Sequence, residues 1–468
     1  MKILEYIAQT VRNISSRRIY LDGEYLLLAG FTPGAPYTVE TKGARITLVL
    51  NKGLYRVCKK VKRGKEVSVI DLNSRRILGC LDGLESVRIV IAQGVIHILP
   101  LSVVIRHQER MGRLAENLAK GVISTASVAA GAVVMGLAIH EGLVKEGFTP
   151  SMVYCCEARP DVWALARNNN PVVLPGTIGI VAPMQEAIND EWFAGKIPRT
   201  DVLEFSIPCS GASRAGRSKL KTSCAEEHPD VGHLVHAALQ YVTRSNPAVV
   251  IWENVPEYAE TASGYILRYQ LRDMGYKTHE TVLVGSDYNC LENRRRWCLV
   301  ATSPGIEFDF ALLEKPLGAV RNLSEILDEI PDDDPRWSKM QGLKDKEVRD
   351  KTAGKGFAMQ IFDPTSTRIS TITKGYAKVR SPDPKIAHPT NPDMLRQLTP
   401  SEHARIKGIP EGLIAGASST LAHEVLGQSV LFAPFVSVGN LVAKSLKRWF
   451  ATAKAPNTPD FALARPAG

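Results

Sequence analysis

The segment VLEFSIPCSGASRAG, residues 202–216, carries the strongest indication of the fold. Its first half is an apolar run typical of a buried strand, and its second half is a loop of small residues. In open α/β sheets, ligands bind at the carboxyl ends of the strands. The segment therefore predicts that Cys209 is displayed where chemistry takes place. Considered alone, such a cysteine is more often an inert buried thiol.

Similar apolar runs flank this segment and alternate with helical stretches such as 226–245. Strands are predicted at residues 151–157, 202–209, 248–255, 277–284 and 296–302. This alternation indicates a doubly wound, mostly parallel sheet. The uncharged run 122–139 is long enough for a membrane span. However, half of it is Ala, Gly, Ser or Thr and it has no aromatic anchors, so a strand, turn and helix of the same sheet fit better.

Two further elements place polar side chains at strand ends. IWENVPEY (251–258) carries Glu253 and Asn254 one β-α-β crossover after Cys209. A carboxyl group is costly to bury without a task. YNCLENRRRWCLVA (288–301) places Arg294 and Arg296 two residues apart, hence on one strand face. They suit an anionic group or the orientation of a carboxylate, although for the arginines alone a solvated strand end is the commoner explanation.

The order of these elements resembles the DNA (cytosine-5) methyltransferases over residues 121–448. The family's motifs occur here in the family's order: Pro-Cys, Glu-Asn-Val and an element like Gln-x-Arg-x-Arg. The next segment, RQLTPSEHARIKGIP (396–410), is similar to the family's R.LT..E..RLQGFP. EVLGQSVLFAPFVSVGNLVAK (424–444) is similar to its closing GN.V helix. The resemblance implies a Rossmann-like methyltransferase domain that uses S-adenosylmethionine.

The resemblance also assigns chemical roles. Cys209 would add as thiolate to carbon 6 of cytosine and make carbon 5 nucleophilic. Glu253 would protonate or hydrogen-bond ring nitrogen 3 and the exocyclic amine, and Asn254 would support the backbone around it. Arg294, and less strongly Arg296, would stabilise the flipped nucleotide and help to keep Cys209 ionised. No base for the carbon-5 proton is identifiable, and water would serve.

The cofactor loop departs from the family pattern. SVAAGAVVMG (127–136) keeps two glycines but lacks the family's Phe-x-Gly-x-Gly. Glu157 follows Gly136 at about 20 positions, the spacing at which nucleotide folds place an acid on the ribose hydroxyls. The expected cofactor-binding residues are Gly131, Gly136, Glu157, Pro208, Ser429 and Val430. Two smaller departures are Glu292 in place of the family's Gln and Gln428 in place of Asn.

Most of the chain's excess positive charge lies near its N-terminus. Residues 1–110 hold 18 Lys and Arg against 9 Asp and Glu, whereas the rest holds 40 against 39. This asymmetry indicates a polyanion partner or a solvated basic face. Val-, Ile- and Leu-rich runs predict strands at 17–31, 44–51, 66–72 and 86–101, in two hairpins joined by the basic run 59–65. IYLDGEYLLLAGFTPGAPYTVE (19–40) resembles the swapped-hairpin domains of SymE-type toxins and AbrB-like transcription factors.

We therefore expect an α/β methyltransferase core with a small target-recognition region and an N-terminal all-β domain. The expected parts are a basic β-hairpin domain (1–105), a helical connector (106–120), the catalytic core (121–315), the target-recognition region (316–390), C-terminal blocks that return to the core (391–450) and a disordered tail (451–468). The region 366–389 mixes Lys, Arg, Ser, Thr and Tyr, which suits phosphate and base contacts.

The expected function is methyl transfer to carbon 5 of cytosine in double-stranded DNA, by a bacterial or phage enzyme without a cognate nuclease in the same chain. The family pattern leaves RNA cytosine-5 methylation open. A catalytically inactive DNA-binding regulator is a further alternative, although such a protein need not keep Cys209, Glu253 and Arg294 together. Eight cysteines without a Cys-x-x-Cys pair predict no zinc site. We expect a cytoplasmic enzyme, monomeric on DNA, without metal or membrane.

Overall fold

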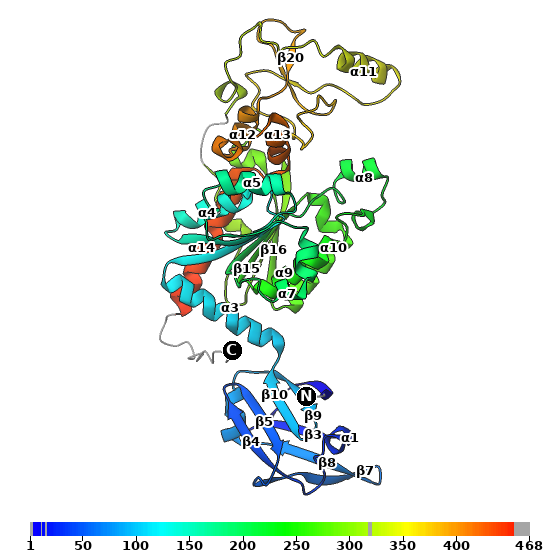
Figure 1. The fold of residues 1–468 in the computed structure, drawn as a ribbon, viewed down its shortest axis with the longest axis vertical. Coiled ribbons are helices and arrows are strands. Elements are labelled where there is room, and N and C mark those ends of the chain that lie inside the picture. The colour runs from blue at the N-terminus through cyan, green and yellow to red at the C-terminus, as the bar shows by residue number, and fades with distance from the viewer. Residues whose placement is uncertain (1–2, 11, 15, 317–320, 454–468) are drawn as a thin grey trace. The chain divides into compact units, whose positions relative to one another are not determined.

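A computed structural model describes residues 3–453 except 11, 15 and 317–320. The chain divides into two compact units, and the boundary falls between Glu109 and Arg110. Both residues belong to one helix, α3 (Ser102–Ala119). The units are described separately below (Figure 1).

The N-terminal unit is built from antiparallel strands. Its strands are β1 (Ile3–Thr10), β2 (Arg12–Ile14), β3 (Ser16–Asp22), β4 (Pro36–Lys42), β5 (Arg45–Leu50), β6 (Tyr55–Arg56), β7 (Cys58–Lys62), β8 (Lys65–Leu72), β9 (Ser86–Ala92) and β10 (Val95–Pro100). They form a sheet in the order β1-β9-β10-β5-β4-β6 and a second in the order β2-β3-β8-β7. Short helices α1 (Glu24–Leu28), α2 (Arg75–Leu78) and η1 (Gly79–Leu81) complete the unit.

Three details differ from the strand pattern expected here. The stretch 17–31 is not one strand, because Gly23 adopts a φ of 152° and α1 follows β3. The stretch 86–101 is a hairpin that turns at Gly94. The basic run 59–65 does not join two hairpins but forms one, with positive φ at Arg63 and Gly64 in its turn.

The second unit contains the predicted doubly wound sheet, with strand order β13-β12-β11-β14-β15-β17-β16. Its strands are β11 (Val122–Val128), β12 (Thr149–Cys156), β13 (Ile178–Ile180), β14 (Val202–Phe205), β15 (Val249–Asn254), β16 (Lys277–Val284) and β17 (Arg295–Thr302). The first five strands in this order are parallel, while β17 runs antiparallel to both β15 and β16. The sheet is therefore mixed, with an antiparallel pair at one edge.

Helices cover both faces of this sheet (Figure 1). The helices of residues 122–315 are α4 (Val134–Lys145), α5 (Pro160–Asn169), α6 (Met184–Asn189), α7 (Glu191–Ala194), α8 (Arg214–Leu220), η2 (Ala225–Glu227), α9 (Leu234–Ser245), η3 (Pro256–Glu260), α10 (Ala262–Asp273), η4 (Gly285–Tyr288) and η5 (Phe310–Leu312). Alternate residues of β15 serve two cores, with Ile251 in one and Trp252 in the other. The run 122–139 is strand β11, a turn and helix α4, as expected.

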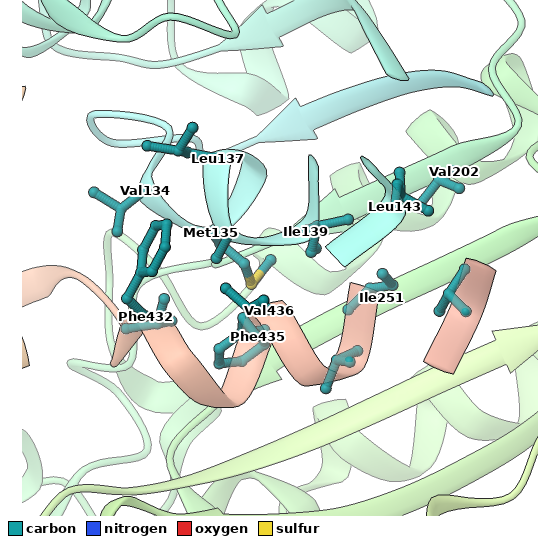
Figure 2. Packing of buried hydrophobic residues seen from close by; sticks show 14 of the residues in the cluster. Val134, Met135, Leu137, Ile139, Leu143, Val202, Ile251, Phe432, Phe435 and Val436 are labelled. Atoms are coloured by element: carbon teal, nitrogen blue, oxygen red, sulfur yellow. The ribbon is translucent and has the colours of Figure 1, made fainter. Parts of the chain in front are cut away.

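The core beside α4 is completed by the last described helix. Phe432, Phe435 and Val436 of α14 (Phe432–Ala453) pack against the apolar side of α4 (Figure 2). The two helices approach closely, because a Cβ atom built at Gly142 would lie 2.3 Å from the carbonyl oxygen of Val436. A side chain at this position would therefore force the helices apart.

Residues 321–390 form a smaller lobe around an apolar cluster that includes Ile369, Ile372 and Tyr376, together with Leu398 and Ile406 from the segment that follows. Its elements, with the helices that return to the sheet, are η6 (Leu323–Glu325), α11 (Gln341–Thr352), β18 (Ile361–Phe362), β19 (Lys385–Ala387), β20 (Leu395–Arg396), α12 (Pro400–Lys407), η7 (Glu411–Ile414) and α13 (Ser419–Gln428). Strands β18, β19 and β20 make a small sheet. The tail expected over 451–468 is helical to Ala453, and its remainder lies outside the described residues.

Helix α3 is anchored to the second unit by polar contacts. Its Asn117 Nδ2 donates to Asp201 Oδ2 at 2.6 Å, and Arg113 pairs with the same buried carboxylate at 3.3 Å. Ser124 donates to it from both its backbone N–H and its hydroxyl group. Across the described ranges, no single helix is long and apolar enough to cross a membrane, and only the bent pair α13–α14 passes by length and composition.

Candidate active site

Three strands bring their chemical groups to one edge of the sheet. Strands β14 and β15 are parallel and end at this edge, with Phe205 and Asn254 as their last residues. Strand β17 begins there, since Asn254 is opposite Trp297 in the antiparallel register. The ends of two strands and the start of a third therefore meet, although they are far apart in the sequence.

Cys209 lies four residues beyond the end of β14 and is partly buried. Its carbonyl oxygen accepts hydrogen bonds from the backbone N–H groups of Ala212 and Ser213, at 3.0 and 2.8 Å. The Ser213 side chain then caps the short helix α8 by accepting from Gly216 N–H. A tight turn thus holds the cysteine. The loop borders a cavity of about 500 Å³, whose opposite wall contains residues 257–262.

Glu253 and Arg296 form an ion pair at this edge. Arg296 Nε lies 2.7 Å from Glu253 Oε1, and both side chains are largely buried. The negative charge of an ionised Cys209 also acts on Arg296, whose pKa is lowered mainly by burial, then by Arg294, and raised by Glu253 and Cys209. A cation therefore pairs with a carboxylate and lies within electrostatic reach of a thiol, an arrangement that favours negative charge on both.

Asn254 connects the two strands that carry Cys209 and Glu253. Its side-chain amide donates to the carbonyl oxygen of Ile207 at 3.2 Å and accepts from the backbone N–H of Val255 at 2.8 Å. It is a supporting residue, because its hydrogen-bonding groups are used by the backbone.

Arg294 is oriented differently from Arg296. Strand β17 begins at Arg295, so the two arginines do not share a strand face as expected. Arg294 donates to Glu292 Oε1 at 3.3 Å and to the carbonyl oxygen of Gly427 at 3.1 Å. Arg296, and not Arg294, is therefore the ion-pair partner of Glu253.

Glu157 and Gly131 form a cradle at the ends of β11 and β12. The carboxylate of Glu157 accepts from the backbone N–H of Gly131 at 2.8 Å and from that of Arg159 at 2.9 Å. Gly131 has a φ of 54°, and a Cβ atom built on it would meet nothing within 4 Å. A fixed carboxylate beside open space fits the ribose of a nucleoside cofactor such as S-adenosylmethionine.

Other expected cofactor residues lie elsewhere. Gly136 faces the core, since a Cβ atom there would lie within 2.9 Å of the Val133 and Glu204 side chains. Its role is close packing and not cofactor contact. Val430 is also a buried core residue. Ser429 ends α13, and its hydroxyl donates to Val425, whereas Pro208 is exposed beside Cys209.

The cofactor loop keeps its shape without the family's glycines. Ala129 and Val133 adopt φ values of 55° and 59°, in the left-handed region that a β-branched residue rarely occupies. Val133 is completely buried, and its packing against Met152 and Trp163 compensates for this strain.

Sequence reasoning did not find two buried ionisable residues near the site. Lys407 lies 2.6 Å from Glu292, and both side chains are completely buried. Glu204 in β14 is likewise buried. The sequence does indicate both residues: Lys407 is flanked by Ile406 and GIP, and Glu204 lies within the apolar run VLEF. In the part of the chain that the structure describes, no group of three His, Cys, Asp or Glu side chains is arranged to hold a metal ion.

The sequence model of the family described as C-5 cytosine-specific DNA methylase matches residues 142–448. The matched range does not reach the N-terminal unit. Among characterised proteins, the chain is 30% identical to the Type II methyltransferase M.NlaX of Neisseria lactamica, over 54% of this chain and 77% of that protein. It is 27% identical to the Type II methyltransferase M.MspI of a Moraxella species, over 54% of this chain but only 58% of that protein.

The fold is also found in a solved methyltransferase. The crystal structure of S. pombe Dnmt2 matches with a TM-score of 0.51 and 18% identity, covering 70% of this chain and 99% of that one. At this identity the match bears on the fold alone.

Proposed function

Since the chain belongs to the C-5 cytosine-specific DNA methylase family, we propose that Cys209 is the nucleophile that adds to carbon 6 of a cytosine in duplex DNA. The observation that carries this proposal is the meeting of Cys209, Glu253 and Arg296 at one sheet edge, with Arg296 at 2.7 Å from the carboxylate. The family uses S-adenosylmethionine, which when bound supplies an electrophilic methyl group.

In this scheme the thiolate of Cys209 forms a bond to carbon 6, and the electron pair of the 5,6 double bond moves to carbon 5. Glu253 transfers a proton to ring nitrogen 3, where negative charge develops, and accepts a hydrogen bond from the exocyclic amine. Arg296 holds one carboxyl oxygen of Glu253 and stabilises the thiolate before attack. Asn254 keeps the Cys209 turn and the Glu253 strand end at a fixed spacing. Once carbon 5 is methylated and loses its proton to water, Cys209 leaves.

Glu157 and Gly131 are the residues that we assign to the cofactor's ribose. The target base must leave the helical stack to reach a pocket at this edge. We assign target recognition to residues 316–390, where the backbone N–H of Ile369 donates to the carbonyl oxygen of Leu291, in the segment before β17, at 2.8 Å.

The test of the nucleophile is the substitution Cys209→Ser, compared with Cys224→Ser at an exposed cysteine further along the chain. Cys209→Ser should abolish transfer of labelled methyl groups to mixed DNA and leave DNA binding intact, because a hydroxyl is a far poorer nucleophile at neutral pH. Cys224→Ser should behave as the native protein. Bisulfite sequencing of the products gives the methylated positions. Substantial turnover by Cys209→Ser would exclude the covalent mechanism.

The N-terminal unit has a separate proposed role as a phosphate-binding module of the SymE or AbrB type. The β7–β8 hairpin carries Lys59, Lys60, Lys62, Arg63 and Lys65, against one acidic residue between positions 58 and 66. Strand β7 is the edge of its sheet and is largely exposed. Such a basic edge suits contacts to the backbone of DNA, which add affinity without reading bases.

A further inference from the structure

A completely buried ion pair lies behind the arginines of the candidate site. Glu292 precedes Arg294 by two residues, and Lys407 is the last residue of α12. Lys407 Nζ lies 2.6 Å from Glu292 Oε2, and neither side chain is exposed. Both positions depart from the family pattern quoted above, which has glutamine at each. The two departures face each other as opposite charges.

Glu292 joins three parts of the second unit. Its other carboxyl oxygen, Oε1, accepts from Arg294 at 3.3 Å and from the backbone N–H of Ile372, in the lobe of residues 316–390, at 3.0 Å. Arg294 in turn donates to the carbonyl oxygen of Gly427 at the end of α13. The carboxylate therefore links the segment that carries Arg296 to the proposed target-recognition region and to α12.

The pair also balances charge at the site. Three cations, Arg294, Arg296 and Lys407, are close to two carboxylates, Glu253 and Glu292. This leaves one excess positive charge, which matches one thiolate at Cys209. Removal of the Lys407 charge alone would cancel the excess, and removal of the Glu292 charge alone would double it. Removal of both would restore the native balance.

We propose that the buried Glu292–Lys407 ion pair is a positioning device, which holds the arginine segment against the target-recognition region and sets the charge that Cys209 experiences. Neither residue needs to touch DNA or cofactor for this role. The inference rests on the proposed function of Cys209.

The groups around Lys407 come from each element packed against it. They are Glu292 and Cys290 from the segment before β17, Arg294 and Arg296 beside them, and His403 from α12. Burial, and then Arg294, lower the pKa of Lys407 to about 7, while Glu292 raises it. Loss of Glu292 would therefore favour a neutral lysine.

The experiment measures the rate at which iodoacetamide alkylates Cys209 as a function of pH, with the modified peptide quantified by mass spectrometry in the full chain. The variants are Lys407→Gln, Glu292→Gln and the two together. One unit charge acting across roughly 10 Å, at an effective dielectric constant of about 20, moves a titration by about one pH unit. We expect Lys407→Gln to move the midpoint of alkylation upward by about this amount. Glu292→Gln should move it downward or, if Lys407 becomes neutral, leave it in place.

The double variant distinguishes an ion pair that sets the charge at Cys209 from one that only stabilises the fold. Its alkylation midpoint and its turnover number should return to native values, with an unchanged KM for cofactor. As a matched control, Arg396→Gln with Glu402→Gln removes another buried ion pair, which joins β20 to α12 at 2.7 Å and, in the described part of the chain, forms no hydrogen bond or ion pair with Arg294 or Arg296. This control should change stability without moving the midpoint.

An unmoved midpoint in Lys407→Gln, or a double variant no closer to native than Lys407→Gln, would overturn the proposal. If Lys407→Gln does not fold, Lys407→Arg and Glu292→Asp keep both charges and change only the geometry. They should lower the turnover number several-fold and leave the midpoint in place, and native turnover in both would overturn the positioning role. Turnover by Cys209→Ser would instead refute the proposed function, while the alkylation result would still stand as a statement about charge.

Discussion

Glu204 should make the protein less stable as the pH rises, and its replacement by glutamine should remove this dependence. The carboxyl group lies inside the sheet, on β14, and neither oxygen has a hydrogen-bond partner of ordinary geometry among the described residues. Burial raises the pKa of Glu204 to about 8 from its usual 4.5, while the nearby Ser127 hydroxyl lowers it slightly. Glu204 is therefore protonated in the native protein at neutral pH.

The magnitude follows from the difference between the folded and unfolded pKa values. Between pH 4.5 and 8 the folded protein holds one proton that the unfolded chain has released, so stability falls as the pH rises. Each pKa unit corresponds to ~1.4 kcal/mol, and the rise from 4.5 to about 8 therefore costs about 5 kcal/mol by pH 8. Above pH 8 this contribution is constant. Glutamine has nearly the same shape, carries no charge and does not titrate.

The assay is urea unfolding of the native protein and Glu204→Gln at intervals from pH 5 to pH 9. The two free energies of unfolding should agree near pH 5 and diverge to about 5 kcal/mol by pH 8 to 9, in favour of the variant. Glu307→Gln, at a side chain that is 81% exposed, controls for the loss of a surface charge and should follow the native curve. Parallel curves for the native protein and Glu204→Gln would refute the argument that this carboxyl group is kept neutral by burial.

Three further outcomes are expected. Gly142→Ala should lower the free energy of unfolding by about 1–3 kcal/mol, since the new Cβ atom would collide with α14; a native urea midpoint would show that the helices can separate without cost. A protein that starts at Ser102 should lose the proposed phosphate contacts of the N-terminal unit, so each lost contact should flatten the dependence of log affinity on log salt by ~0.9 while the methylated sequence stays the same. An unchanged salt slope in the protein that starts at Ser102 would refute the DNA-binding role of the N-terminal unit. A protein that starts at Gly121 should instead be less stable, because it loses the contacts of Arg113 and Asn117 with Asp201.

Much of the sheet could be predicted from sequence because its strands are short apolar runs at regular spacing. The meeting of Cys209 and Glu253 at one edge followed from the same rule, since parallel strands end together. The choice of Arg296 as the partner of Glu253 did not follow, because it depends on the antiparallel register of β17 against β15, a strand that lies well before it in the sequence.

The partners of buried charges were also beyond the reach of sequence patterns. The whole lobe of residues 316–390 lies between Glu292 and Lys407 in the sequence, and no local periodicity links them. Gly136 illustrates the opposite error: a glycine in a glycine-containing loop suggested a ligand contact, but its missing side chain makes room for Glu204 and Met152. Both cases required three-dimensional packing.

The packing of α4 against α14 has a consequence for synthesis. Helix α4 ends at Lys145, yet its partner begins only at Phe432, so more than half of the chain must be translated between the two. Until α14 leaves the ribosome, the apolar side of α4 that Figure 2 shows packed against Phe432, Phe435 and Val436 has no cover. A nascent catalytic unit therefore exposes the core beside its cofactor loop for most of its elongation, and such a chain is a substrate for chaperones. Premature termination before residue 432 yields an unfinished core and not a smaller enzyme.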